Sequence, residues 1–143
     1  MTQRFHPDRR HFLLLAAGGV LAFVLPPRLW TSTPPSAPGA VHPDPRPNIT
    51  AAKVLTAEQL NGDKELIELF DGVRAIPQIV DGIRCSCGCA DLPGFYSLLS
   101  CFEGVGAMST WCPICQGTGA LVVRLHGRGR TLAQIREAVD ARY

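Results

Sequence analysis

The sequence predicts a small, mainly α-helical domain of short helices around a cysteine cluster. Three observations lead to this prediction: apolar residues recur at helical spacing in several short segments, two Thr-x-x-Gln patterns are typical of capping boxes, and all six cysteines lie between Cys85 and Cys115. About 90 residues form only a small hydrophobic core, so we expect the cysteines to stabilise the fold further through metal binding or disulfides.

The first expected helical region covers residues 57–70. Thr56 and Gln59 form the first capping-box pattern. Gly62 interrupts the region, which predicts one or two short helices rather than a long one. The apolar positions at helical spacing are Leu60, Ile67 and Phe70.

The next two expected helices flank the first cysteines. Residues 75–83 have apolar residues at helical spacing, and Pro77 is tolerable in a first turn, so this helix leads directly to Cys85. Residues 93–102 fit a helix that contains Cys101 and has an apolar side formed by Phe95, Leu98, Leu99 and Phe102.

Two more helices are expected towards the C-terminus. Ser109 or Thr110 is the expected cap of a helix that carries Cys112 and Cys115. Thr131 opens a last amphipathic helix through the second capping box, with its apolar side formed by Leu132, Ile135 and Val139.

Composition divides the chain into three parts. Residues 1–27 contain Arg9-Arg10 and then an uncharged apolar run that is too short to cross a bilayer as a helix, which predicts a signal peptide or an N-terminal anchor. The segment around Arg9-Arg10 resembles the twin-arginine export signal, and whether the signal is cleaved stays open. Proline-rich residues 28–49 predict an extended linker, and residues 50–143 form the cysteine-rich metal-binding domain.

The cysteines form two close groups and one separate residue. If residues 85–89 are extended, Cys85, Cys87 and Cys89 present three sulfur atoms on one face, and Gly88 lets the backbone turn around a bound ion. Three-residue spacing also puts Cys112 and Cys115 on one face, near a helix N-terminus that lowers thiol pKa values. The sequence therefore predicts a metal site formed by Cys85, Cys87, Cys89, Cys101, Cys112 and Cys115.

A purely sulfur ligand set favours soft metal ions. We expect Cu(I) first, zinc second and an iron–sulfur cluster third, because closely spaced thiolates suit multinuclear Cu(I) clusters, whereas a closed zinc site uses four ligands. His126 is the only histidine of residues 50–143 and is expected on the surface near a helix C-terminus. Met108 is a candidate accessory ligand, but core packing is its commoner role.

Two other readings of the cysteines stay open. In an exported protein, six cysteines are compatible with three disulfides in a stapled interaction module. Trp111 to Cys115 resembles a thioredoxin-type redox motif, which implies a thiol–disulfide redox protein that uses Cys112 and Cys115. The segment from Cys112 to Gly119 also resembles one zinc repeat of DnaJ-type chaperones, which implies a hairpin.

A broader resemblance covers residues 76–143. The cysteine pattern from Arg84 to Cys89, with Cys101-Phe102 and Cys112-Pro113-Ile114-Cys115, resembles the exported bacterial proteins that are named for a PCYCGC motif. This resemblance implies export and attachment to the cell envelope. The chain departs from the family pattern at Arg84, Ser86, Phe95 and Met108.

These observations predict an exported protein of the periplasm or of the outer face of the cytoplasmic membrane, which binds soft metal ions for storage, sensing or delivery. A protein that receives the metal is an expected partner, and a membrane is contacted only through an uncleaved N-terminal segment. The net charge of +2 does not favour nucleic-acid binding. Catalysis is not expected, and the acidic residues Asp63, Glu65, Glu68 and Asp71 are expected to form a solvated helix face.

Overall fold

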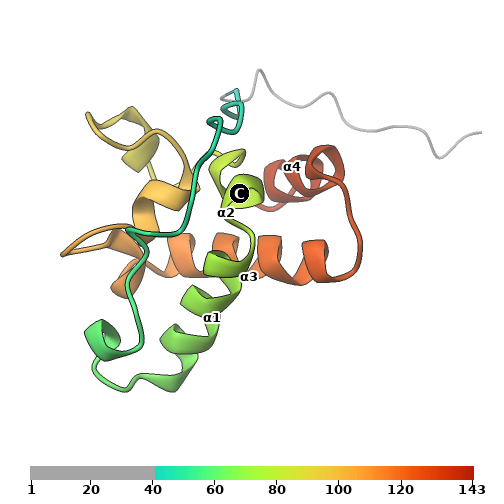
Figure 1. Cartoon of the computed structure of the whole chain (residues 1–143). Helices are drawn as coiled ribbons and strands as arrows, with labels where there is room; N and C mark the ends of the chain where they lie inside the picture. Colours follow the sequence, from blue (N-terminus) through green and yellow to red (C-terminus); the bar gives the residue numbers. More distant parts are fainter. Residues whose placement is uncertain (1–40) are drawn as a thin grey trace, which may run out of the picture. The chain divides into compact units, whose positions relative to one another are not determined.

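The computed structural model describes residues 41–143, which form four α-helices joined by short 3-10 helices and turns (Figure 1). The prediction of a mainly α-helical domain with a cysteine cluster is confirmed for these residues. The expected export signal and the linker up to residue 40 lie outside them. The α-helices are α1 (Lys64–Ala75), α2 (Pro77–Asp81), α3 (Pro113–Gly127) and α4 (Leu132–Asp140), and the 3-10 helices are η1 (Glu58–Leu60), η2 (Cys89–Asp91), η3 (Leu98–Phe102) and η4 (Met108–Thr110).

Helix α3 is the centre of the fold. Helices α1 and α4 both pack against it, and η3 packs against α1, α2 and α3 (Figure 1). The core between these elements contains the fully buried rings of Phe70 and Phe102, which meet edge to face with their centroids 4.9 Å apart. Val73, Val122, Ile135 and Val139 extend this core towards α4.

The expected helical region 57–70 consists of two elements. The chain breaks between η1 and α1 because Asn61 and Gly62 both have positive φ values, 53° and 80°. Helix α1 is capped instead by the side chain of Asp63, which accepts hydrogen bonds from the backbone N–H groups of Glu65 and Leu66. The helix then continues past Phe70 to Ala75.

The two expected helices around the first cysteines had different outcomes. Helix α2 forms within residues 75–83, with Pro77 in its first turn as predicted. The helix expected over residues 93–102 is wrong in its first half. Gly94 has a φ of 90° and Ser97 is extended, so only η3 is helical in this segment.

Helix α3 begins later than predicted. Ser109 and Thr110 belong to the separate turn η4, and the residue at the N-cap of α3 is Cys112, followed by Pro113. The hairpin implied by the DnaJ-type resemblance is wrong, because α3 continues through Gly117 and Gly119. The capping box of Thr131 and Gln134 at the start of α4 is confirmed.

Gly119 allows a close approach between α3 and η3. A Cβ atom at this position would lie 2.6 Å from Cζ of the buried Phe102 ring. We therefore expect Gly119→Ala to lower the free energy of unfolding by about 1–3 kcal/mol, because the ring has to move within a packed core. Urea unfolding followed by circular dichroism measures this change.

The matched control is Gly127→Ala in the same helix, where an added Cβ atom would have no neighbour within 4 Å. This variant should be neutral or more stable than the wild type, because alanine is the better helix former. Equal unfolding midpoints for the two variants would contradict the proposed close contact.

Contacts of the domain extend into the segment that the sequence assigns to the linker. Nδ1 of His42 accepts a hydrogen bond from the backbone N–H of Arg84 at 2.9 Å, and its Nε2 lies 2.9 Å from Asp140. Arg136 in α4 donates to the carbonyl oxygen of Pro43 at 2.8 Å. These contacts join residues 42 and 43 to α4 and to Arg84, which directly precedes Cys85.

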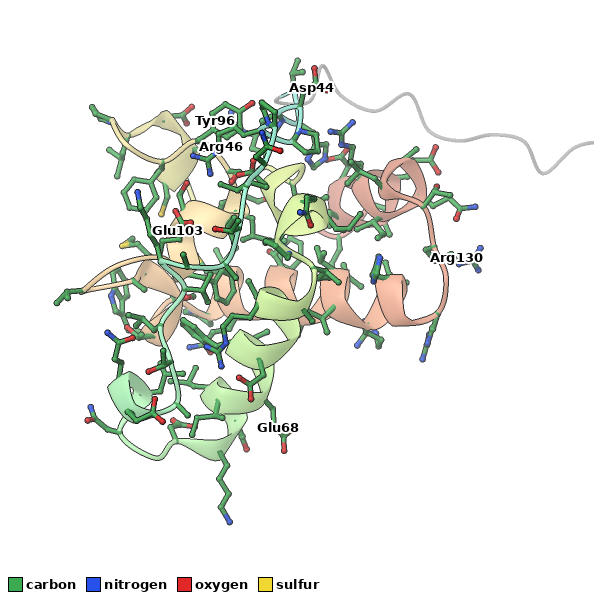
Figure 2. All side chains as sticks on the ribbon, in the orientation of Figure 1. Asp44, Arg46, Glu68, Tyr96, Glu103 and Arg130 are labelled. Carbon is green, nitrogen blue, oxygen red and sulfur yellow. The ribbon has the colours of Figure 1, made fainter. Side chains whose placement is uncertain are left out.

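Arg46 makes the strongest contact of this segment. Its guanidinium and its backbone N–H donate to the carboxylate of Asp81, with distances of 2.7 Å from Nη2 and 2.8 Å from the backbone nitrogen. Asp81 is fully buried and also accepts a hydrogen bond from Ser97 at 2.6 Å. The guanidinium lies 4.8 Å from the centre of the Tyr96 ring, whose hydroxyl donates to the carbonyl of Asp44 (Figure 2).

Within residues 41–143, no helix has both the length and the apolar character needed to span a membrane.

Candidate metal centre

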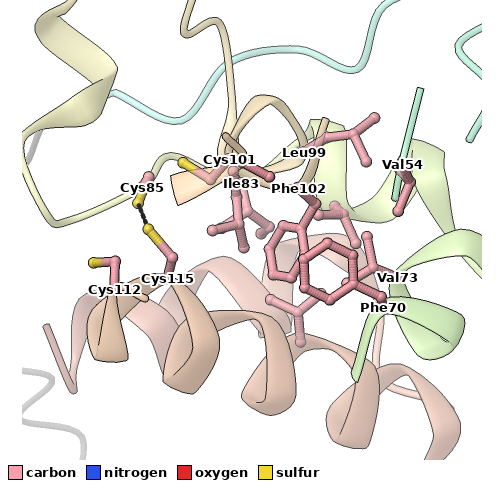
Figure 3. Packing of buried hydrophobic residues seen from close by; sticks show 14 of the residues in the cluster. Val54, Phe70, Val73, Ile83, Cys85, Leu99, Cys101, Phe102, Cys112 and Cys115 are labelled. Atoms are coloured by element: carbon pink, nitrogen blue, oxygen red, sulfur yellow. Dashed lines mark hydrogen bonds between the residues drawn. The ribbon is translucent and has the colours of Figure 1, made fainter. Parts of the chain in front are cut away.

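The cysteines reach one region of the molecule from three separate segments. Cys85, Cys87 and Cys89 follow α2, Cys101 lies in η3, and Cys112 and Cys115 lie at the start of α3. Figure 3 shows Cys85, Cys101, Cys112 and Cys115 together at one end of the apolar core. The packing of η3 against α2 and α3 therefore brings together cysteines that are distant in sequence.

Backbone and side-chain hydrogen bonds hold these segments in place. The N–H of Leu98 donates to the carbonyl oxygen of Ile83 at 2.7 Å and joins η3 to the chain that enters the first cysteines. The hydroxyl of Ser109 donates to the carbonyl oxygen of Cys101 at 2.8 Å, and the amide of Gln116 donates to the carbonyl oxygen of Ser109 at 2.9 Å. This role of Ser109 is not visible in the sequence, because only a tertiary contact distinguishes it from a helix cap.

Residues 85–89 bring their three sulfur atoms together through a turn. The Sγ atoms of Cys85 and Cys87 are 3.2 Å apart, and those of Cys87 and Cys89 are 2.8 Å apart. The expected convergence of these sulfurs is confirmed, but the expected extended backbone is wrong. Gly88 has a φ of 86°, which lets the chain turn directly into η2.

Cys115 joins this turn to the rest of the cluster. Its Sγ atom lies 3.5 Å from those of both Cys85 and Cys87. Two sets of three sulfur atoms could each hold a metal ion, because the three atoms of a set all lie within 4.8 Å of one another. The first set contains Cys85, Cys87 and Cys115, and the second contains Cys89, Cys101 and Cys115. Cys115 belongs to both sets.

Cys112 is the only predicted ligand that belongs to neither set of three. It is 8% exposed and lies at the N-cap of α3. Burial raises the pKa of its thiol, but hydrogen bonds from the backbone N–H and the side chain of Cys115 outweigh burial, so the pKa is lower than usual. The helix N-terminus thus favours a thiolate at Cys112, as the sequence predicted.

The other thiols have unequal proton affinities. Hydrogen bonds from Cys101 and Cys115 lower the pKa of Cys85 to about 2, whereas burial and the neighbouring Cys89 raise the pKa of Cys87 to about 12. The pKa of Cys115 is also raised, because its proton is shared with Cys101 and Cys85 in a buried site. These shifts favour a thiolate at Cys85, and the thiols with raised pKa values would release their protons when a cation binds.

All six cysteines are free thiols, and each predicted ligand lies in the described part of the chain. No known protein family, curated protein or solved structure matches this chain. The geometry of the cysteines is therefore the basis for a functional proposal.

The remaining candidate residues lie apart from the sulfur sets. Met108 is partly buried against the hydrophobic core, which agrees with a packing role. His126 lies in the last turn of α3, where a cationic side chain complements the helix dipole. The four acidic residues of the expected solvated face are all exposed, and they are Asp63, Glu65, Glu68 and Asp71.

Proposed function

We propose that this chain is an exported protein that binds Cu(I) through its cysteine thiolates and stores or delivers it. The observation that supports the proposal most directly is the convergence of five sulfur atoms, from three separate segments, into two sets that could each hold a metal ion. These thiols are packed against one another, and a soft cation would bind several of them together.

Cu(I) suits this arrangement better than the other soft metals. Cu(I) binds readily to three thiolates, and each sulfur set offers three. A structural zinc site takes four ligands, so zinc would need a fourth donor beside each set. An iron–sulfur cluster stays the third candidate, because it also uses cysteine thiolates.

Export is the part of the proposal that rests on the N-terminal sequence. Arg9-Arg10, the apolar run and the proline-rich segment support an exported protein held near the outer face of the membrane or released into the periplasm. The resemblance to PCYCGC-motif proteins supports the same location. A metal-transfer protein is the partner that delivery would require.

Elemental analysis with thiol counting tests the metal site. The full chain, purified without oxygen or chelator after growth with copper and zinc, should contain stoichiometric copper and show six titratable thiols after metal removal. Metal-free protein without reactive thiols would contradict the proposal and favour a disulfide framework.

A pair of variants locates the binding groups. Cys87→Ser should weaken Cu(I) binding at the set that contains Cys87 about tenfold or more, because it removes a ligand, and loss of a group that only supports a ligand already costs about 10–100-fold. Ser86→Ala changes the exposed neighbouring residue in the same turn and should retain Cu(I) as the wild type does. Competition with a chromophoric Cu(I) chelator measures both, and equal retention would contradict the assignment of the turn.

Thiol–disulfide exchange is the second candidate function, and the position of Cys112 favours it. A cysteine with a lowered pKa at a helix N-terminus, three residues before another cysteine, is the arrangement of a redox pair. This function predicts that Cys112 reacts with iodoacetamide faster than every other thiol, and that Cys112→Ser leaves Cu(I) stoichiometry unchanged while it abolishes disulfide exchange.

A further inference from the structure

The two sulfur sets differ in their access to solvent. Cys89, Cys101 and Cys115 are all buried, with 3%, 0% and 0% of their surface exposed. The other set contains Cys87, which is only partly buried and lies between exposed Ser86 and Gly88. We name the set of Cys85, Cys87 and Cys115 the outer site, and the set of Cys89, Cys101 and Cys115 the inner site.

The two sites are connected through sulfur. Cys115 belongs to both, and Cys87 of the outer site lies 2.8 Å from Cys89 of the inner site, sulfur to sulfur. A thiolate has several lone pairs and can bridge two Cu(I) ions, so a shared cysteine allows both sites to be filled at once. An ion that moves from one site to the other can therefore stay bound to Cys115 throughout.

The ligands of the inner site are all buried. Cys101 lies in η3 with fully buried Leu98, Leu99 and Phe102 around it in the same element. Cys115 lies in the first turns of α3 and is also 0% exposed. Cys87 is the only ligand of the two sites that is not buried, so an incoming ion meets the outer site first.

Cys112 lies beside the outer site. Figure 3 shows it beside Cys115, and at 8% exposed it is, after the partly buried Cys87, the most exposed cysteine of the cluster. It is placed to supply a ligand at the moment when an incoming ion is still held by its carrier. This role would explain why Cys112 lies close to the cluster although it belongs to neither set.

We propose that the cluster holds at least two Cu(I) ions in these two sites bridged by Cys115, and that copper enters and leaves only through the outer site. The inference rests on the proposed Cu(I) binding and adds the number of ions and the order of exchange. Transfer between the sites is ligand exchange without a change in oxidation state, in which each thiol that binds Cu(I) gives its proton to solvent.

The experiment is anaerobic Cu(I) titration of the full chain, followed by rapid mixing with excess bicinchoninate. The wild type should bind about two or more Cu(I) ions per chain, with saturation shown by elemental analysis. The chelator should remove copper in two phases, the fast phase from the outer site and the slow phase from the inner site. Copper release in one phase would overturn the proposal.

Three variants assign the phases. Cys87→Ser should remove the fast phase and leave the slow one, whereas Cys89→Ser should remove the slow phase and leave the fast one. Ser86→Ala is the matched control and should keep both phases. A Cys87→Ser variant that keeps the fast phase would overturn the assignment of the outer site, and the circular dichroism spectrum of each variant verifies its fold.

The outcomes separate the two proposals. One Cu(I) ion per chain would overturn the bridged pair of sites and leave the proposed copper binding intact. No Cu(I) binding by the wild type, with six reactive thiols present, would overturn both.

Discussion

Asp81→Ala should destabilise the domain by about 3 kcal/mol, the lower end of the range for removal of one partner from a buried ion pair, because the other partner, Arg46, is 37% exposed. The Asp81 side chain is 0% exposed and accepts hydrogen bonds from Arg46 and Ser97. Its removal leaves the buried hydroxyl of Ser97 and the half-buried guanidinium of Arg46 without their acceptor. Urea unfolding followed by circular dichroism measures the effect.

Asp91→Ala is the matched control for this prediction. Arg84 and Asp91 form an ion pair of nearly the same length, 2.8 Å against 2.7 Å for Arg46 and Asp81, but 71% of the Asp91 side chain is exposed. A solvated ion pair contributes about 0–1 kcal/mol. Equal losses in the two variants would contradict the special role of the buried carboxylate.

The Asp81 contact also has a predicted pH dependence. Burial raises the pKa of this carboxyl, but the hydrogen bonds from Arg46 and Ser97 outweigh burial, so the folded-state pKa is lower than the unfolded one. The resulting stability is therefore fully present above the unfolded pKa of about 4 and is lost as the pH falls through the folded value. Asp81→Asn should reduce the loss of unfolding free energy as the pH falls below about 4. An unchanged dependence of the unfolding free energy on acidic pH would contradict this prediction.

Local patterns predicted the helices whose signals lie within a single segment. The Thr131 capping box and the first-turn Pro77 are such signals, and both helices formed as expected. The start of α3 was not predictable in this way, because Ser109 and Thr110 are both good N-cap residues, and tertiary contact instead places the helix start at Cys112. Gly119, a residue that lowers helix propensity, is instead required by the approach of Phe102.

The candidate metal centre was predictable as a set of residues but not as an arrangement. Cysteine spacing indicated that Cys85, Cys87 and Cys89 share a face, although the backbone there is a turn. The division into two sets, and the place of Cys115 in both, depend on how η3 packs against α3. The role of Arg46 was hidden because proline-rich composition around it is typical of linkers.

Saturating Cu(I) should stabilise the folded chain by about 4 kcal/mol when the free ion concentration is about a thousand times the dissociation constant. The expected reason is that the sulfur ligands come from segments that are distant in sequence, so the unfolded chain offers no preformed site. Thermal unfolding under anaerobic conditions, with and without Cu(I), measures the shift in Tm.

Cys115→Ser should abolish most of this stabilisation, because Cys115 is the ligand that both sulfur sets share. Mg²⁺ is the control ion, since a hard cation prefers oxygen ligands and should leave Tm unchanged. An equal Tm with and without Cu(I) would contradict a binding site formed only in the folded state.

The copper-dependent stability should also increase with pH up to the range in which the thiols with raised pKa values, such as Cys87, lose their protons. Metal ligands must be thiolates, and the pKa of Cys87 is raised to about 12 by burial and by Cys89, so Cu(I) has to displace a tightly held proton at neutral pH. Fewer protons are displaced as the pH rises, and binding becomes stronger. This range lies far above the acid range of Asp81, so a single pH series on apo and copper-loaded protein separates the contribution of the carboxylate from that of the cysteines.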